Sequence, residues 1–241
     1  MLGMVKTGCC GWSEPHAEYF QDFDVMEVQE TFYQPGRIAK YEKWRAAAPR
    51  GFEFVVKAWQ LVTHASSSPT YRRLSMAMPA AAKNHYGAFR PTDEVLTAWQ
   101  VTAEAAKALG ATVILFQCPA SFAPTEENRK NLRTFFSRID RGSCVLAWEP
   151  RGAWEEKDIK RLCEDLDLVH CVDPFKARPL AGQIRYFRLH GLPGYDLDYT
   201  YSDDDLQRLL SMADRDEVYV MFNNYSMLDD CRRYRRLVDA L

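Results

Sequence analysis

Charged and amide side chains stand near the ends of short apolar segments throughout this sequence. The members of this set are Glu27, Lys57, Gln117, Glu149, Arg151, Asp173, Arg188, His190 and Asn223. In most of these segments apolar residues precede the polar one at alternate positions, as on one face of a strand. Burying so many charges is costly unless they pair, so an internal salt-bridge network is the structural alternative to a binding site.

The basic side chains of this set predict a site for an anion. Arg151, Arg188 and Lys57 can together hold a phosphate or a carboxylate, because arginine binds such groups through two parallel hydrogen bonds. His64 and His190 are candidates to move protons or, when protonated, to strengthen the site. The residues expected to orient the ligand are Gln117 and Asn223. The ligand that this set favours is small, anionic and phosphate-bearing.

The carboxylates in the set are compatible with several roles. Glu27, Glu149 and Asp173 could act as a general base, hold Mg²⁺ or Mn²⁺, or orient the basic side chains. A divalent metal would need three or four ligands from the candidates Glu27, His64, Glu149, Asp173 and His190. No H-E-x-x-H or comparable local spacing supports such a site, so the metal stays an alternative.

Together these side chains favour an enzyme. The predicted reaction is the hydrolysis of a phosphoester or a lyase step, on an anionic small molecule or a nucleic-acid fragment. The catalytic candidates are Glu27, Lys57, Glu149, Asp173 and His190. The alternative from a different class is a non-catalytic barrel that binds a ligand or another protein, because one fold can host many functions.

Two further mechanisms stay open. Lys57 could form a Schiff base if burial or a neighbouring cation lowers its pKa, whereas pairing with Glu27 or Glu149 would raise that pKa and argue against it. Glu27 and Glu149 could instead serve as the acid and the nucleophile of a glycosidase, which requires a separation of about 5 to 10 Å. The sequence does not supply this distance.

Aromatic side chains near the same segment ends could stack on a base or a sugar. They are Trp12, Tyr33, Trp59, Phe122, Trp154 and Tyr195. The ligand-binding candidates among them are Tyr33, Trp12 and Tyr195. The structural alternative is that these rings wall the protein interior, since aromatic residues are common in ordinary cores.

Eight short β-branched or aromatic segments have to position these residues. They are Val5–Cys10, Val25–Thr31, Phe52–Ala58, Thr112–Gln117, Cys144–Glu149, Val169–Asp173, Ile184–His190 and Glu217–Asn223. Segments with helical periodicity separate most of them: Pro35–Ala48, Thr92–Leu109, Thr125–Ile139, Glu155–Asp165 and Ser202–Met212, with a terminal helix at Met227–Ala240 and a short one near Tyr71–Lys83. This alternation predicts an α/β protein, a (β/α)8 TIM-type barrel of eight parallel strands in one domain over residues 1–241.

Composition limits the partners. The chain has 241 residues, 47% of them hydrophobic, and a formal net charge of -2. This charge predicts no strong attraction to nucleic acid or to an anionic membrane, and no run approaches the ~18 apolar residues of a membrane helix, so we expect a cytoplasmic protein. Seven cysteines without a C-x-x-C pair indicate free thiols, and the arginines at 232–236 suggest a solvated helix face.

The order of the motifs resembles the YecE-like family, the domain of unknown function 72. The matching elements are Gly8-Cys9-Cys10-Gly11-Trp12, Glu27 with Thr31-Phe32-Tyr33, Phe54-Val55-Val56-Lys57 with Thr63-His64, Gln117-Cys118-Pro119, Glu149-Pro150-Arg151, Asp173, Arg188-Leu189-His190-Gly191 and Phe222-Asn223-Asn224. The resemblance implies a TIM-type barrel with its site at the C-terminal ends of the strands. The family name itself assigns no reaction.

Overall fold

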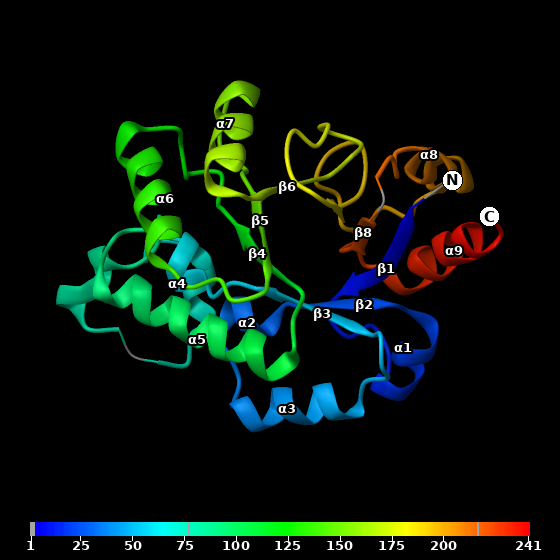
Figure 1. The fold of residues 1–241 in the computed structure, drawn as a ribbon, viewed down its shortest axis with the longest axis horizontal. Coiled ribbons are helices and arrows are strands. Elements are labelled where there is room, and N and C mark those ends of the chain that lie inside the picture. Colours follow the sequence, from blue (N-terminus) through cyan, green and yellow to red (C-terminus); the bar gives the residue numbers. More distant parts are fainter. Residues whose placement is uncertain (1–2, 77, 216) are drawn as a thin grey trace.

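The fold is built on parallel β-strands that close into a barrel. The structure, a computed structural model, describes residues 3–76, 78–215 and 217–241. The strands in these ranges are β1 (Met4–Cys10), β2 (Val25–Val28), β3 (Glu53–Lys57), β4 (Val113–Gln117), β5 (Val145–Glu149), β6 (Val169–Val172), β7 (Arg185–Leu189) and β8 (Glu217–Phe222). Each strand pairs with its neighbour in sequence, and β8 pairs with β1 (Figure 1). The predicted (β/α)8 architecture is therefore confirmed.

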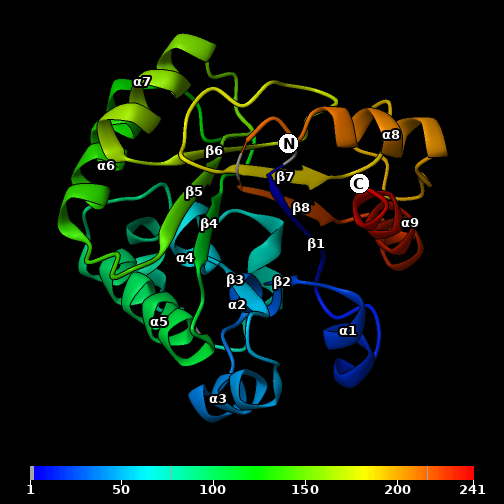
Figure 2. The same ribbon diagram turned by 45° about the vertical axis from the view of Figure 1, so that its right-hand side comes forward.

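Helices surround this barrel (Figure 2). The longer ones are α1 (His16–Asp22), α3 (Ile38–Ala47), α5 (Asp93–Leu109), α6 (Glu126–Arg138), α7 (Glu156–Leu166), α8 (Asp203–Ser211) and α9 (Met227–Asp239), and the short α2 (Glu30–Tyr33) and α4 (Gln60–Thr63) follow β2 and β3. The hydroxyl of Thr92 caps α5 by accepting a hydrogen bond from the Val95 amide, as helix starts favour. Gly110 ends α5 with a φ of +59°, a conformation that suits glycine.

Three segments differ from the sequence-based prediction. The predicted strand Val25–Thr31 ends at Val28, and Thr31 lies in α2, where its hydroxyl donates to the carbonyls of Val28 and Lys57. The predicted helix near Tyr71–Lys83 is wrong, because this region forms two 3₁₀ helices, η1 (Pro69–Arg73) and η2 (Ala80–His85), on either side of position 77, which lies outside the described residues. The helix α1 was not predicted, since Tyr19 is its one fully buried residue and leaves little apolar periodicity.

Mostly aliphatic side chains and two tyrosines fill the barrel interior. The buried inner cluster consists of Cys10, Val25, Val55, Val113, Leu115, Ala147, Val169, Cys171, Ile184, Tyr186, Tyr219 and Met221. At the N-terminal end, Lys6 forms salt bridges with Glu53 and Glu217 and contacts the Tyr219 hydroxyl at 3.1 Å. This end of the barrel is thus closed by a compensated polar network, and the apolar layer separates it from the opposite mouth.

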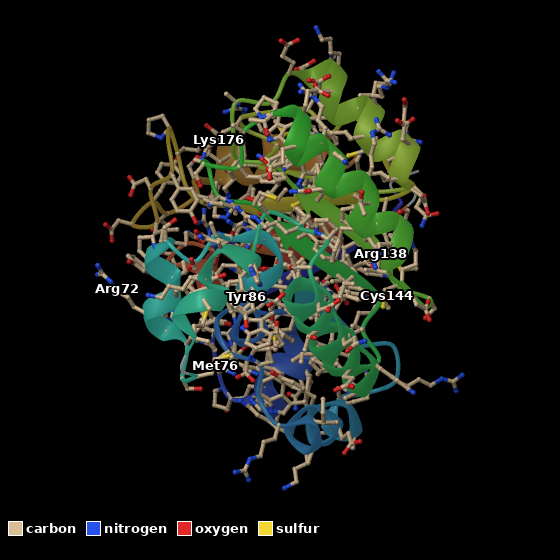
Figure 3. All side chains as sticks on the ribbon, turned by 90° about the vertical axis from the view of Figure 1, so that its left-hand side faces the viewer. Arg72, Met76, Tyr86, Arg138, Cys144 and Lys176 are labelled. Carbon is tan, nitrogen blue, oxygen red and sulfur yellow. The ribbon has the colours of Figure 1, made fainter. Side chains whose placement is uncertain are left out.

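Figure 3 shows the two ends of the barrel on opposite sides of the view. Lys176, which follows β6, and Arg72, which follows β3, project on the side where the strands end. Arg138 and Cys144, which precede β5, lie on the other side. Residues that follow the strands therefore gather at one face, where active sites of this architecture are built.

Three arginines of α9, namely Arg232, Arg233 and Arg235, are paired with carboxylates. Arg232 contacts Glu14 and Asp22, and Arg235 contacts Asp239 at 2.9 Å. This pairing suits the predicted solvated helix face, because each of these positive charges already has an acidic neighbour.

Every cysteine is a free thiol, which confirms the sequence-based prediction. Cys9, Cys10, Cys118, Cys163, Cys171 and Cys231 are buried, and Cys144 is half-buried. None of the helices in the described ranges has both the length and the apolar character needed to span a bilayer.

Candidate functional site

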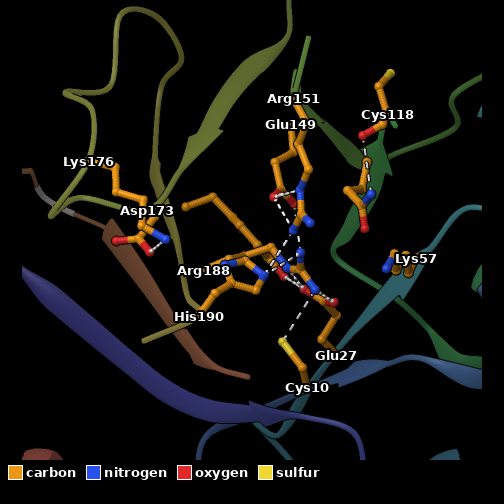
Figure 4. Close-up of polar contacts among 12 residues, drawn as sticks. Cys10, Glu27, Lys57, Cys118, Glu149, Arg151, Asp173, Lys176, Arg188 and His190 are labelled. Atoms are coloured by element: carbon orange, nitrogen blue, oxygen red, sulfur yellow. Dashed lines mark hydrogen bonds and ion pairs between the residues drawn. The ribbon is translucent and has the colours of Figure 1, made fainter. Parts of the chain in front are cut away.

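Arg188 lies at the centre of a polar cluster at the C-terminal mouth of the barrel (Figure 4). Its Nε and Nη2 donate to Oε2 and Oε1 of Glu27, both at 2.9 Å, and its Nη1 donates to Oε2 of Glu149 at 2.6 Å. The Tyr186 hydroxyl adds a hydrogen bond of 2.7 Å to Oε2 of Glu27. Arg188 is fully buried, and its donors hold the two carboxylates in place.

Arg151 is the arginine that extends from this cluster toward the opening. Its Nε and Nη2 lie 2.7 Å and 2.6 Å from Oε1 of Glu149, and 25% of its side chain is exposed. Burial raises the pKa of Glu149, but the charges of Arg188 and Arg151 outweigh burial and hold this pKa well below its ordinary range. Glu149 is therefore a carboxylate at neutral pH, and it positions Arg151 at the mouth.

His190 is buried between the two arginines. Its Nε2 lies 3.0 Å from Nη2 of Arg151 and 3.3 Å from Nη1 of Arg188, and both of these atoms are donors. Burial and the charge of Arg188 lower the pKa of His190 to about 2. The Tyr195 ring stacks on His190 at 4.6 Å, and the Arg151 guanidinium lies 4.9 Å from the same ring. His190 is therefore a neutral acceptor that orients Arg151.

Lys57 ends β3 and points into the same mouth. Its Nζ lies 3.4 Å from Oε1 of Gln29 and 4.2 Å from the centre of the Phe32 ring, and the residue is 5% exposed. Within the ranges that the structure describes, no carboxylate oxygen lies within 4.0 Å of this amine. Burial and the charge of Arg188 lower the pKa of Lys57 to about 7.

His64 lies on the Lys57 side of the mouth. It follows α4, and its Nδ1 is 2.8 Å from the Thr63 hydroxyl. Its ring meets Phe32 edge-on at 4.9 Å, so Phe32 contacts both His64 and Lys57. Burial, followed by the charges of Lys57 and Arg151, lowers the pKa of His64 to about 3. At neutral pH His64 is thus a neutral polar group and not an anion-binding cation.

Asp173 lies at the mouth, and its cationic partner is Lys176 and not an arginine of the cluster. Its Oδ1 accepts a hydrogen bond from the Phe175 amide at 3.1 Å, and its Oδ2 is 3.2 Å from Nζ of Lys176. Burial raises the pKa of Asp173, whereas Lys176 lowers it. Lys176, which the sequence analysis did not single out, is the direct cationic partner of this carboxylate (Figure 4).

The two predicted amides lie at strand ends of the mouth. Gln117 is in register with Glu149 across β4 and β5, and its Nε2 donates to the Cys118 carbonyl at 3.2 Å. Asn223 follows β8, and its backbone amide donates to the Leu189 carbonyl at 2.9 Å. Both residues are half-buried, so both retain solvent-accessible surface.

Two of the predicted aromatic residues have partners outside the arginine cluster. Trp12 stacks on His16 at 3.8 Å and meets Trp44 edge-on at 5.3 Å, in an aromatic cluster of the outer layer. Tyr33 lies under the Arg73 guanidinium at 3.5 Å. The contacts described for Trp12 and Tyr33 therefore place them beside other aromatic and basic side chains, and not against Arg188.

Several contact residues of the site were missed by sequence reasoning. Gln29 contacts both Glu27 and Lys57, and Tyr186 contacts Glu27. Tyr186 stands two positions before Arg188 in β7, so strand alternation already placed both side chains inside the barrel. Phe32 gave no such signal, because the chain turns into α2 after Val28.

A cavity of about 600 Å³ opens beside the cluster. Its lining includes Glu149, Arg151, Asp173, Lys176, His190 and Tyr195, which belong to the ends of β5, β6 and β7 or to the loops after them. A second cavity of about 620 Å³ lies at the opposite end of the barrel, beside Glu53 and Glu217. The first cavity is the candidate site, because barrel enzymes bind their ligands at the C-terminal face.

The described residues do not offer a divalent metal ion a group of converging ligands. In the described part of the chain, no three His, Cys, Asp or Glu side chains converge as a metal-binding group. Arg188 lies between Glu27 and Glu149, and Asp173 pairs with Lys176. The carboxylates are therefore engaged by basic side chains, and the arrangement favours anion chemistry at the cations.

Solved structures with the same fold include two DUF72 family proteins. The one from Enterococcus faecalis V583 has a TM-score of 0.73 and 18% sequence identity, and the match covers 98% of each chain. The one from Thermotoga maritima has a TM-score of 0.70 and 20% identity, over 98% of this chain and 99% of the other. Endonuclease IV from Thermus thermophilus has a TM-score of 0.57 and 11% identity, over 98% and 100%. At these identities the likeness concerns the fold alone.

No curated protein sequence matches this chain. The family model described as "protein of unknown function DUF72" matches residues 6–241, which is all but the first five residues. The chain therefore belongs to the DUF72 family.

Proposed function

We propose that this protein is an enzyme that acts on a small anionic molecule, phosphate-bearing or carboxylate-bearing, at the C-terminal mouth of the barrel. The observation that carries the proposal is a surplus basic side chain. The paired charges of the mouth are Glu27, Glu149, Asp173, Arg151, Lys176 and Arg188, three of each sign. Among the described residues Lys57 has no such partner, so a negatively charged ligand would give the protonated form of this amine the partner that the protein does not provide.

Arg151 is the anchor for the anionic group in this proposal. It is partly exposed, it lines the cavity, and Glu149 and His190 hold its guanidinium in one orientation. A fixed guanidinium loses little freedom when a ligand binds, and it presents its remaining donors as a planar fork. Arg188 supports this geometry from below without touching the ligand.

The reaction we propose is a hydrolytic or lyase step. Lys57, with a pKa of about 7, suits proton transfer near neutral pH, which is the range where a general base works best. Gln117 and Asn223 would orient the substrate from the ends of β4 and β8. A nucleic-acid fragment belongs to the same ligand class, and the fold likeness to an endonuclease IV is a reason to include one in the test.

The glycosidase alternative is less well supported. The arginines around Glu149 hold that carboxyl ionised, so Glu27 would have to be the acid, and both carboxylate oxygens of Glu27 accept hydrogen bonds from the Arg188 guanidinium. Arg188 also contacts both Glu27 and Glu149, so it stands between the two carboxylates that would have to flank a sugar.

Calorimetric titration with sulfate and inorganic phosphate tests the anion site. We expect Arg151→Met to weaken binding by about ten- to a hundredfold, the loss of one charge-assisted hydrogen-bond donor group. Arg161→Met, on an arginine whose side chain is 77% exposed on α7, is the matched control and should bind as the wild type does. Equal affinity of wild type and Arg151→Met for these anions would overturn the proposed role of Arg151 as the anchor.

Catalysis needs a separate readout. Wild type and Glu149→Gln should be compared on phosphomonoesters, short oligonucleotides and phosphorylated carbonyl compounds. The proposal predicts turnover of one of these classes by the wild type and its loss in the variant, because Glu149 positions Arg151. Turnover that is unchanged in Glu149→Gln would remove that positioning role, and anion binding without any turnover would favour the non-catalytic alternative.

A further inference from the structure

Two lysines are buried inside this barrel, and their surroundings are opposite. Lys6, at the N-terminal end, is 8% exposed and contacts Glu53, Glu217 and the Tyr219 hydroxyl. Lys57, at the mouth, is 5% exposed and contacts an amide oxygen and the face of a phenyl ring. The first amine is built into a salt bridge, whereas the second has no carboxylate partner among the described residues.

The surroundings of Lys57 favour its uncharged form. Val55 and Leu115 of the inner apolar cluster lie next to it, at the second position before it in β3 and at its register partner in β4. The charged and titratable groups that act on it are Arg188, Glu27, Glu149, Arg151, His64 and Cys10. The carboxylates among them already pair with arginines, so their effect on Lys57 is largely cancelled.

We propose that Lys57 is a nucleophile that forms an imine with the carbonyl carbon of a small substrate, an oxo acid or a carbonyl-bearing phosphate, whose anionic group is held by Arg151. This inference rests on the proposed function and names its substrate class. A buried lysine near another cation and without a carboxylate partner is the arrangement that leaves an amine nucleophilic at neutral pH.

Imine formation needs only the Lys57 amine and the carbonyl compound, and it releases one water molecule. The Nζ lone pair attacks the carbonyl carbon, and a proton moves from nitrogen to the former carbonyl oxygen, which gives a carbinolamine. The hydroxyl then leaves as water with the second proton of the amine, and a C=N bond to Nζ forms. The resulting imine withdraws electrons from the adjacent carbon, which is the activation that a lyase step needs.

Borohydride trapping tests this step on the full chain. The protein is incubated at pH 7 with pyruvate, glyoxylate or dihydroxyacetone phosphate, then treated with sodium borohydride, whose hydride reduces the C=N bond to a stable amine. We expect a mass gain equal to the carbonyl compound less one oxygen atom, mapped to Lys57 by peptide sequencing. Lys57→Arg should remove this adduct.

Other lysines of the same sample serve as internal controls, which keeps the test valid even if a variant folds poorly. Lys157 has an exposed side chain and an ordinary salt bridge, and Lys6 is buried and paired. We expect labelling of Lys57 to exceed that of Lys157 by about tenfold or more at pH 7, because an ordinary lysine is almost fully protonated there. Labelling of Lys57 at or below the level of Lys157 with all three probes would overturn the inference.

The outcome separates the two proposals. If sulfate binding depends on Arg151 but no probe labels Lys57, the imine is wrong and the anion site stands. If pyruvate labels Lys57 equally well in wild type and in Arg151→Met, the imine stands and the anchor role of Arg151 is wrong.

Discussion

Arg188 and Glu27 form a two-point salt bridge in which neither side chain has any exposed surface. The two hydrogen bonds, Nε to Oε2 and Nη2 to Oε1, are both 2.9 Å long. The third guanidinium nitrogen, Nη1, contacts Glu149 at 2.6 Å. One buried arginine thus sets the positions of the carboxylates from β2 and β5, and through Glu149 the position of Arg151.

Removing this arginine should destabilise the protein strongly. Arg188→Met leaves the buried Glu27 without its cation and takes one of two cations from Glu149, and we expect the free energy of unfolding to fall by about 3–5 kcal/mol. Urea denaturation followed by circular dichroism measures the change. Arg161→Met is the exposed control and should change stability by less than about 0.5 kcal/mol. Adding Glu27→Gln to Arg188→Met should recover part of the loss, and a purely additive double variant would contradict the coupling of the pair.

The two buried lysines should respond to the same substitution in opposite directions. At pH 6 the buried Lys57 amine is protonated in the folded wild type and has no carboxylate partner among the described residues, so Lys57→Met removes an unpaired buried charge and we expect a gain of roughly 1–3 kcal/mol. In the unfolded chain Lys57 has its ordinary pKa of 10.5, against about 7 in the fold. Between these values the unfolded wild type binds more protons than the folded one, so wild-type stability rises with pH and the gain shrinks by pH 9.

Lys6→Met is the matched comparison for Lys57→Met. It leaves Glu53 and Glu217 without their shared cation, and the expected loss is about 3 kcal/mol at neutral pH. Chemical denaturation of both variants at pH 6, 7.5 and 9 gives the comparison. A loss of stability in Lys57→Met at pH 6 would show that the Lys57 amine has a stabilising partner after all.

Alternation of apolar and polar residues was sufficient to predict the barrel and much of its mouth. Glu149, Arg188 and His190 stand at positions of one parity that follow buried residues in their strands, and the structure brings these three into one network. The pattern works here because parallel strands that close into a barrel direct one parity inward along their whole length.

The pairing of charges could not be predicted in the same way. Whether Arg188 faces a ligand or two carboxylates depends on distances between β2, β5 and β7, which lie far apart in sequence. The segment after Val28 also turns into α2 instead of continuing as a strand, so the approach of Phe32 to Lys57 was hidden. The packing around the lysine, and not its position in β3, decides its protonation.

The tautomer of His190 follows from its neighbours. Nε2 faces donors from Arg151 and Arg188, so the ring proton must sit on Nδ1. With a pKa lowered to about 2 by burial and Arg188, His190 should not titrate between pH 5 and 8. Nitrogen-15 NMR of the imidazole rings should show one histidine with an unprotonated Nε2 and constant shifts over this range. Titration of His190 within this range would contradict the proposed hydrogen-bond directions.

Anion binding should depend on pH through Lys57. Below pH 7 this amine is protonated and adds a positive charge to the Arg151 site, whereas above pH 7 it is neutral. Sulfate is a suitable probe because its own charge stays constant over this range, and we expect its affinity to fall by about tenfold between pH 6 and pH 8.5. Calorimetric titration of wild type and Lys57→Met measures this dependence, and the variant should bind sulfate weakly and equally at all pH values. A pH dependence that survives in Lys57→Met would assign the titration to another group and separate Lys57 from the anion site.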